Sequence, residues 1–162
     1  MLTELFLTLK PYGYLGIFLI SLISASTIIF PIPSAAFVFA SGAILNPILV
    51  GLIAGVGAAL GEFVGYGLGI GSRKALKKKW KREIEKIEKL FQKYGGFLII
   101  LIFAATPLPD DLTGIAAGIL KYPVKKFFIA SLIGKIILHL ALAYAGLYGM
   151  KWILNILSSG FG

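Results

Sequence analysis

Five ionisable residues lie inside otherwise apolar segments of this sequence: Glu62, Asp110, Asp111, Lys135 and His139. A charged side chain surrounded by hydrocarbon costs a few kcal/mol unless it is paired or hydrated. Such residues are therefore candidates for function wherever they occur in an apolar run. We predict that Glu62, Asp111 and Asp110 handle protons or a cation, and that Lys135 and His139 bind a head group.

Lys135 and His139 are four residues apart, so they share one face of a helix. Together they could hold a phosphate or carboxylate group, or pass a proton to Glu62 or Asp111. A structural alternative is that Lys135 pairs with an acid only to be tolerated, while His139 bonds a backbone carbonyl. Pairing with Glu62 would satisfy both charges, and a buried acid beside a cation also suits proton coupling.

Catalytic chemistry finds little support in the sequence. There is one histidine and no cysteine, and we find neither a nucleophile elbow nor a cluster of metal ligands. We therefore predict that the chain is not an enzyme and needs no metal or cofactor.

The elements that must position these residues form an internal repeat. At a constant offset of 76 residues, two Pro-x-Pro breaks and the segments behind them match: Pro31, Pro33, Gly42 and Pro47 with Pro107, Pro109, Gly118 and Pro123. Repeats built around broken apolar segments are typical of transport proteins, whose broken tips meet near the bilayer midplane. We predict the hairpin tips at Pro31, Pro33, Ser34, Pro107 and Pro109.

The repeat separates the two aspartates. Asp110 corresponds to Ser34, and both follow the second proline and begin a short leg, where a side-chain oxygen can cap the new helix. Asp111 corresponds to Ala35, so the fold does not require an acid there. Asp111 is therefore the better candidate for a proton or cation site, whereas capping is an alternative explanation of Asp110.

Segment lengths predict an all-helical membrane protein of a single domain, residues 1–162. Residues 1–10 should form a short interfacial helix that ends at Pro11, and 12–45 a first re-entrant hairpin with legs 12–30 and 34–45. The second hairpin has legs 94–105 and 112–120. Short legs of about 14–18 Å cannot cross a hydrocarbon core of roughly 30 Å. Residues 48–70 and 124–150 can span it, which makes repeat 1 (12–71) and repeat 2 (94–150) inverted.

Glycine recurs every four residues along the first spanning segment, at Gly57, Gly61, Gly65 and Gly69. Such a stripe lets two backbones approach closely. Its counterpart in the second spanning segment is Ala141, Ala145 and Gly149, so we expect the two spanning helices to cross along these faces. The stripe could also serve a homo-oligomer.

The net charge of +9 is concentrated, because ten of the sixteen Lys and Arg residues lie between Arg73 and Lys93. This is the positive-inside pattern of a cytoplasmic face, and few aromatic residues accompany it, which argues against nucleic acid. Ser72 can cap an amphipathic helix over 73–93 that ends at Gly95-Gly96. We expect its lysines to reach lipid phosphates. Fourteen lysines against two arginines suggest a thermophilic prokaryote, such as an archaeon, and hence its cell membrane.

Three strings give the sequence a family resemblance: Pro31-Ile32-Pro33 with Ala40-Ser41-Gly42, Gly61-Glu62-Phe63-Val64-Gly65-Tyr66-Gly67-Leu68-Gly69, and Pro107 with Ala117-Gly118 and Phe127-Phe128. The chain resembles the DedA family, within the wider VTT-domain group of SNARE-associated Golgi-type proteins. The resemblance implies two facing re-entrant hairpins. It also implies flipping of polyprenyl-phosphate carrier lipids in prokaryotes, often driven by the proton motive force, or phospholipid scrambling in eukaryotes.

The chain departs from the family pattern at three positions. The first hairpin of the family carries an acid where this chain has Ala35, and the second carries arginines at the positions of Ala104 and Asp110. Those arginines are the family's phosphate ligands, and only Glu62 matches a family acid. Lys135 and His139 could replace the missing cations; the alternative is a different cargo.

The sequence therefore predicts a transporter that flips an anionic lipid, a polyprenyl phosphate or a phospholipid, with proton coupling. Membrane lipids are its expected partners. Three alternatives stay open: an ion or small-solute transporter that uses the buried acids, a non-selective scramblase, and a membrane-shaping protein that acts through the basic amphipathic helix.

Overall fold

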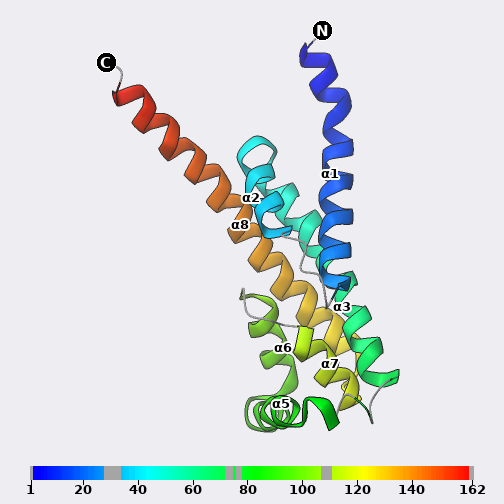
Figure 1. Ribbon diagram of the computed structural model, residues 1–162. Coiled ribbons are helices and arrows are strands. Elements are labelled where there is room, and N and C mark those ends of the chain that lie inside the picture. The colour runs from blue at the N-terminus through cyan, green and yellow to red at the C-terminus, as the bar shows by residue number, and fades with distance from the viewer. Residues whose placement is uncertain (1, 28–33, 72–74, 76–77, 107–110, 161–162) are drawn as a thin grey trace.

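The computed structural model describes residues 2–27, 34–71, 75, 78–106 and 111–160 (Figure 1). Most of the described residues are helical and none of them is in a strand. The elements are α1 (Leu2–Ser26), α2 (Ser34–Ile44), α3 (Pro47–Gly71), α5 (Lys81–Tyr94), α6 (Gly96–Ala104), α7 (Asp111–Ile119) and α8 (Val124–Gly160). The Pro-x-Pro tips Pro31, Pro33, Pro107 and Pro109, together with Asp110 and Ser72, lie outside the described residues. The all-helical fold class is confirmed.

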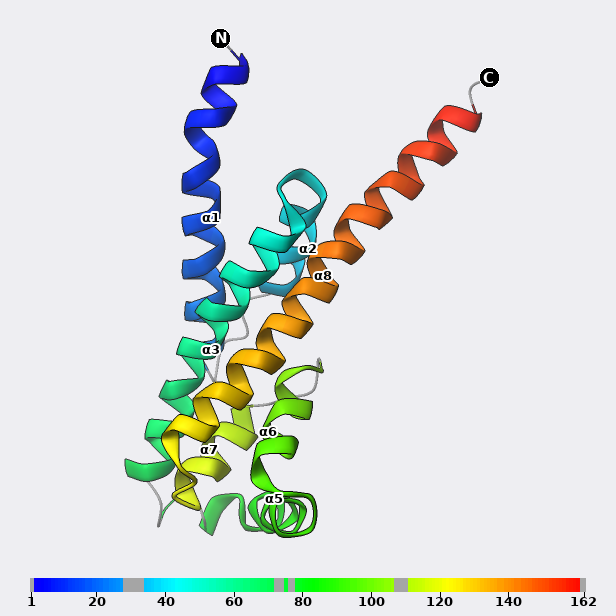
Figure 2. The ribbon, with the colours of Figure 1, turned by 180° about the vertical axis from the view of Figure 1, so that it is seen from behind.

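Among the described residues, α3 and α8 are long and apolar enough to cross a membrane, the latter over Val124–Trp152. Asn46 caps the start of α3, because its Oδ1 accepts hydrogen bonds from the backbone N–H groups of Ile48 and Leu49 at 3.0 and 3.2 Å. The two helices run in opposite directions and lie side by side through the middle of the molecule in both views (Figures 1 and 2). The predicted segments 48–70 and 124–150 are therefore long helices, and α8 continues ten residues further.

We predicted that α3 and α8 cross along the glycine stripe of α3, and this prediction was wrong. Where the two helices contact each other, Gly51 and Gly55 of α3 face Leu140 and Ile136 of α8. The stripe packs against other helices instead: Gly57 and Gly61 contact α1, and Gly69 contacts α7. On α8, Ala141 and Ala145 are exposed. Four-residue spacing fixes a close-packing face but not its partner, and Gly51 and Gly55 form a second such face.

The first helix also differs from the prediction, because α1 continues through Pro11 as one element. Proline removes one backbone hydrogen bond and kinks a helix at a cost of roughly 3 kcal/mol. Ending the helix there would leave the carbonyl groups of a whole turn without partners in the helix, which costs more than one lost bond. Continuity is therefore the cheaper solution, and the apolar part Tyr12–Ser26 follows without a separate interfacial helix.

Helices α1 and α2 form one pair and α6 and α7 a second, and the two pairs approach from opposite ends of α3 and α8. With 25 residues, α1 is as long as α3. In Figures 1 and 2 the first pair lies at the height of the upper half of α8 and the second at the height of its lower half. The end of α1, the start of α2, the end of α6 and the start of α7 all lie at mid-height. With 11, 9 and 9 residues, α2, α6 and α7 are about 14–17 Å long and too short to span a bilayer.

In each pair, one helix packs on the long helix of its own half, and the other, α2 or α7, packs on the long helix of the other half. Gly42 of α2 fits against the backbone of Ala143 in α8, and Gly118 of α7 fits against Tyr66 and Gly69 of α3. These two glycines are counterparts at the 76-residue offset of the sequence repeat, and so are Tyr66 and Leu142. A Cβ atom at either glycine would overlap a carbonyl oxygen of the facing helix. Helix-to-helix contact at backbone distance therefore depends on both.

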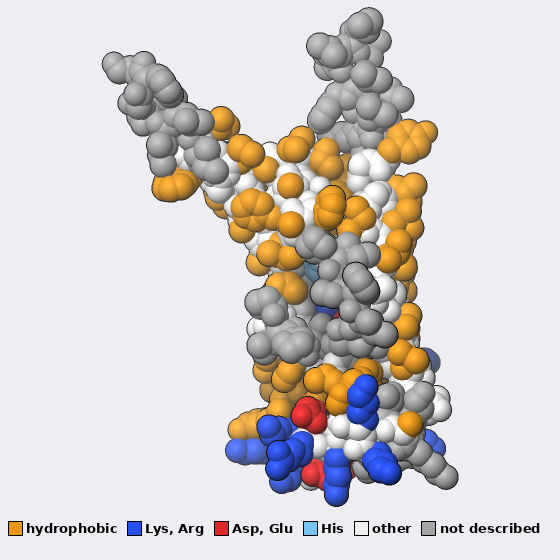
Figure 3. Space-filling model, in the orientation of Figure 1, with side chains coloured by type: hydrophobic (Ala, Val, Ile, Leu, Met, Phe, Trp, Pro, Cys, Tyr) orange, Lys and Arg blue, Asp and Glu red, His pale blue; other side chains and the backbone are white. Residues whose placement is uncertain are grey.

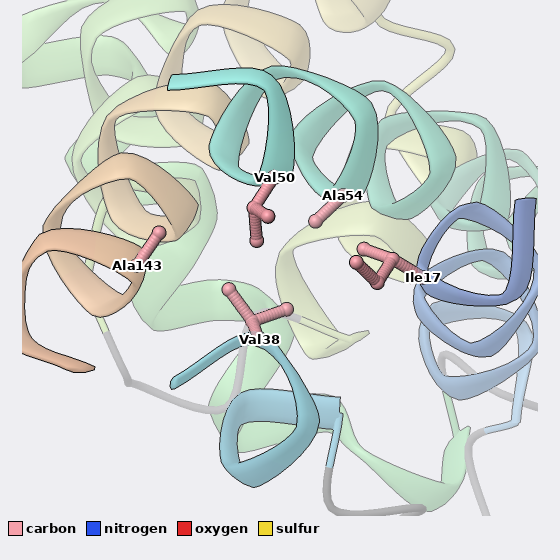
Figure 4. Close-up of a cluster of buried hydrophobic side chains, with 5 residues drawn as sticks. All are labelled: Ile17, Val38, Val50, Ala54 and Ala143. Atoms are coloured by element: carbon pink, nitrogen blue, oxygen red, sulfur yellow. The ribbon is translucent and has the colours of Figure 1, made fainter. Parts of the chain in front are cut away.

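The upper half of the bundle has an apolar core in which Ile17, Val38, Val50, Ala54 and Ala143 meet (Figure 4). These side chains come from α1, α2, α3 and α8. The outward faces of the long helices are also apolar, with Leu52, Val56, Leu60, Ile129, Ile133 and Ile137 exposed. Figure 3 shows this apolar surface as a broad zone above a charged end. Such a surface suits lipid rather than water.

The amphipathic helix α5 lies across the charged end of the molecule (Figures 1 and 3). It begins at Lys81 rather than at residue 73, because Trp80 has φ −116° and ψ 40° and interrupts the predicted helix. Gly95, at φ 85°, ends it as predicted. Its buried Ile84 and Ile87 pack with Ile115 and Ile119 of α7, so protein rather than lipid covers its apolar stripe.

Candidate functional site

Lys135 and Glu62 form an ion pair in the interior of the bundle. The distance from Lys135 Nζ to Glu62 Oε1 is 2.9 Å, and the two side chains are 9% and 5% exposed. They come from α8 and α3, the two long helices, so the pair joins the halves of the chain. The sequence-based pairing of these two residues is thus present in the structure. Figure 3 shows a histidine and a Lys or Arg side chain at mid-height within the apolar zone.

Close-packed glycines bring α1, α6 and α7 to this pair. Gly61, next to Glu62, lies against Leu22 and Ala25 at the end of α1, and Gly134, next to Lys135, lies against Leu101 and Ala104 at the end of α6. From α7, a Cβ atom on Gly114 would lie 3.3 Å from Glu62 Oε2. Inner ends of helices from both pairs therefore surround the two charges.

His139 lies one turn beyond Lys135 on α8 and is 5% exposed. Its Nδ1 is 2.7 Å from the backbone oxygen of Lys135, which can only accept, so Nδ1 carries the hydrogen. This is the structural role that the sequence left open for the histidine. The bond fixes the orientation of the ring, and in a neutral ring Nε2 is then an acceptor.

Further polar residues are buried that the sequence analysis did not select: Ser21, Thr113 and Ser131, each at most 2% exposed. Ser131 stands four residues before Lys135, so Ser131, Lys135 and His139 form one polar stripe on α8 that the sequence spacing could have revealed. The hydroxyls of Ser21 and Thr113 have no hydrogen-bond partner among the described residues. No pattern in the sequence marks these two as buried.

The side chains of the two aspartates that follow Pro109 are not described by the structure. Asp110 lies outside the described residues, and so does any capping by it. Asp111 is the first residue of α7, but its side chain is not described. Among the described residues, no group of three His, Cys, Asp or Glu side chains comes together at a spacing that suits a metal ion.

Comparison with known proteins assigns the chain to a family. The family model of the VTT domain matches residues 32–148, which include α2, α3, the ion pair and α8 as far as Tyr148. The chain belongs to the VTT-domain family. The DedA-type resemblance of the sequence is thereby confirmed. A curated relative is the uncharacterized protein MJ0201 of Methanocaldococcus jannaschii, 30% identical over 134 residues, which are 81% of this chain and 82% of the relative. No solved structure matches the chain.

Membership of the VTT-domain family places the chain among membrane proteins that are generally considered transporters. Its two long apolar helices fit this setting, and its archaeal relative fits a prokaryotic membrane. Within the VTT match, the glycine-rich string around Glu62 forms the part of α3 that contacts α1, α7 and Lys135. The most distinctive string of the sequence thus coincides with the site.

Proposed function

We propose that this VTT-domain chain translocates an anionic lipid across a prokaryotic cell membrane. Lys135, with His139 beside it, binds the head group, while Glu62, Asp111 and Asp110 handle the coupled protons. The observation that carries the proposal is the buried Lys135–Glu62 pair at the meeting point of the short helices. A cation at this depth suits a phosphate whose hydrocarbon tail stays in the bilayer.

The packing of the fold does not require these charges, which supports a functional reading. At the 76-residue offset, Glu62 corresponds to Leu138 and Lys135 to Ala59, and His139 corresponds to Phe63. Ala59 is completely buried on α3. The same places in the other half of the chain are therefore occupied by apolar side chains, and a transporter needs its polar site only once.

An inverted repeat with two re-entrant hairpins is the architecture that we propose for this transport. It is supported by the reciprocal contacts of Gly42 with α8 and of Gly118 with α3, and by the approach of the two short pairs from opposite ends. In such folds, broken helices meet near the bilayer midplane and build the substrate site there. The charged end with α5 would face the cytoplasm.

The contacts of α5 do not favour the membrane-shaping alternative. That function needs an apolar helix face that can enter the head-group region. In α5 the central part of that face, Ile84 and Ile87, is buried against α7. Its lysines remain exposed and can still contact anionic lipid, so we propose an orienting role for α5.

Reconstituted full-length protein tests the proposal. Proteoliposomes should be prepared with labelled polyprenyl phosphate or labelled phospholipids, with and without a pH gradient. We expect movement that is selective for the anionic head group in the wild type, and loss of this movement in Lys135→Gln. Lys125→Gln is the matched control, because Lys125 is exposed on the same helix. Unchanged rate and selectivity in Lys135→Gln would refute the ligand role.

Other outcomes of this assay separate the alternatives. Unselective movement of all lipids would mean a scramblase, and ion flux without lipid movement would mean an ion transporter. Glu62→Gln and Asp111→Asn test the coupling. If both leave transport and its dependence on the pH gradient unchanged, the proton role is refuted.

A further inference from the structure

The ion pair leaves Lys135 no room for a second anion while Glu62 remains charged and in place. Its ammonium group lies 2.9 Å from the carboxylate, and both side chains are more than nine-tenths buried. A phosphate that joined them would put two anions beside one cation in a region of low dielectric. That arrangement is strongly unfavourable, because buried charges need compensation. A head group can therefore reach Lys135 only if the Glu62 carboxylate leaves it or takes up a proton.

The first turn of α7 approaches the Glu62 carboxylate from a second side. Gly114 is the fourth residue of this nine-residue helix, and its missing side chain lets the turn approach Glu62 Oε2. Backbone N–H groups in the first turn of a helix lack partners within the helix and carry partial positive charge. Thr113, in the same turn, has a buried hydroxyl without a hydrogen-bond partner among the described residues. The carboxylate thus lies between the Lys135 ammonium group and the start of a helix, and both favour an oxyanion.

We propose that the Glu62 carboxylate occupies the place where the phosphate group of the substrate binds, between Lys135 and the first turn of α7. Glu62 is then an internal competitor that keeps Lys135 compensated when no substrate is present. This inference rests on the proposed function and names its ligand chemistry, a phosphate monoester or diester. It assigns Gly114 as the positioning residue that admits the oxyanion, and Thr113 as a donor to it.

Phosphate binding to the purified full-length protein tests this competition separately from transport. The protein is placed in nanodiscs of phosphatidylcholine, and inorganic phosphate is titrated into the wild type and into Glu62→Gln by calorimetry. A second arm replaces part of the lipid with a long-chain prenyl phosphate and measures its binding. Glu83→Gln is the matched control, because Glu83 is an exposed glutamate on α5.

We expect Glu62→Gln to bind phosphate at least about tenfold more tightly than the wild type, which corresponds to about 1.4 kcal/mol. Glu83→Gln should match the wild type. The double variant Glu62→Gln/Lys135→Gln should lose the gain, because the cation is gone. Tighter binding in both arms would assign the site to phosphate in general, and tighter binding of the prenyl phosphate alone would assign it to lipid-borne phosphate.

Equal or weaker binding by Glu62→Gln in both arms would overturn the inference, as would a gain that persists in the double variant. Glu62→Asp guards against poor folding of the neutral variant, because it keeps the charge but shortens the side chain by one methylene. We expect its affinity for phosphate to lie between those of the wild type and Glu62→Gln. If Lys135→Gln abolishes lipid transport while none of these affinities changes, the proposed function stands and the competition is refuted.

Discussion

Replacing both members of the buried pair with apolar residues should leave the protein folded, whereas replacing one should not. Lys135→Met alone leaves the buried Glu62 carboxylate, which is 5% exposed, without its compensating lysine. Removing one partner of a buried ion pair typically costs about 3–5 kcal/mol. Glu62→Leu alone strands the lysine at a similar cost. The double variant has no uncompensated charge, and buried pairs replaced by apolar residues of similar volume are often neutral or stabilising.

The expected coupling free energy between the two substitutions is therefore large, about 3 kcal/mol, at the upper end for contacting residues. It is measured by a double-mutant cycle on reversible unfolding of the purified protein in mixed micelles. A matched control is the exposed pair Lys81–Glu85 on α5, at 3.9 Å, with side chains 71% and 47% exposed. Exposed pairs one helical turn apart contribute about 0.3–0.5 kcal/mol. Additive effects at Glu62 and Lys135 would refute the reasoning, because the charges would then be compensated by something other than each other.

Three further outcomes follow from the packing. Gly118→Ala should destabilise the protein by about 1–3 kcal/mol, because the new Cβ would overlap the backbone of Tyr66. Gly67→Ala, where a Cβ would meet no atom within 4 Å, should be neutral or stabilising by up to about 1 kcal/mol. Unfolding curves compare the two variants, and equal effects would contradict the close contact at Gly118. Lys121→Gly should stabilise by up to about 1 kcal/mol in the same assay, since Lys121 has φ 55° after α7, and a loss of stability would show that this backbone is not strained. Ile84→Ala should lower the free energy of unfolding by about 2–4 kcal/mol and speed amide hydrogen exchange in α7, because Ile84 packs on that helix. The control Lys86→Ala, at an exposed residue of α5, should do neither. Unchanged exchange in Ile84→Ala would mean that α5 does not stabilise α7.

The positions of the helices could be predicted from the sequence because they follow from local properties. Prolines, glycines and the length of apolar runs placed α2, α3, α6, α7 and the start of α8 within a few residues of their observed bounds. Pro11 misled because a proline removes only one hydrogen bond from a helix and so does not always mark its end. The interruption at Trp80 had no signal, since the apolar stripe continues across it.

Partners of packing faces could not be predicted, because spacing within one helix contains no information about the helix opposite. The stripe at Gly57, Gly61 and Gly69 was correctly read as a close-packing face, but α1 and α7 occupy it instead of α8. The Glu62–Lys135 pair was predictable for a different reason. Opposite charges buried in apolar surroundings have few ways to be compensated, so the rarity of charge identified the partner. Thr113 and Ser21 carry no charge, and for that reason nothing marked them.

The measurement that tests the account most directly is lipid translocation by the Glu62→Leu/Lys135→Met variant in proteoliposomes, beside the wild type. This variant removes both charges and should keep the fold, as the unfolding assay verifies on the same preparation. The account predicts a folded protein that no longer moves lipids with an anionic head group. Translocation at the wild-type rate and selectivity by this charge-free variant would contradict it.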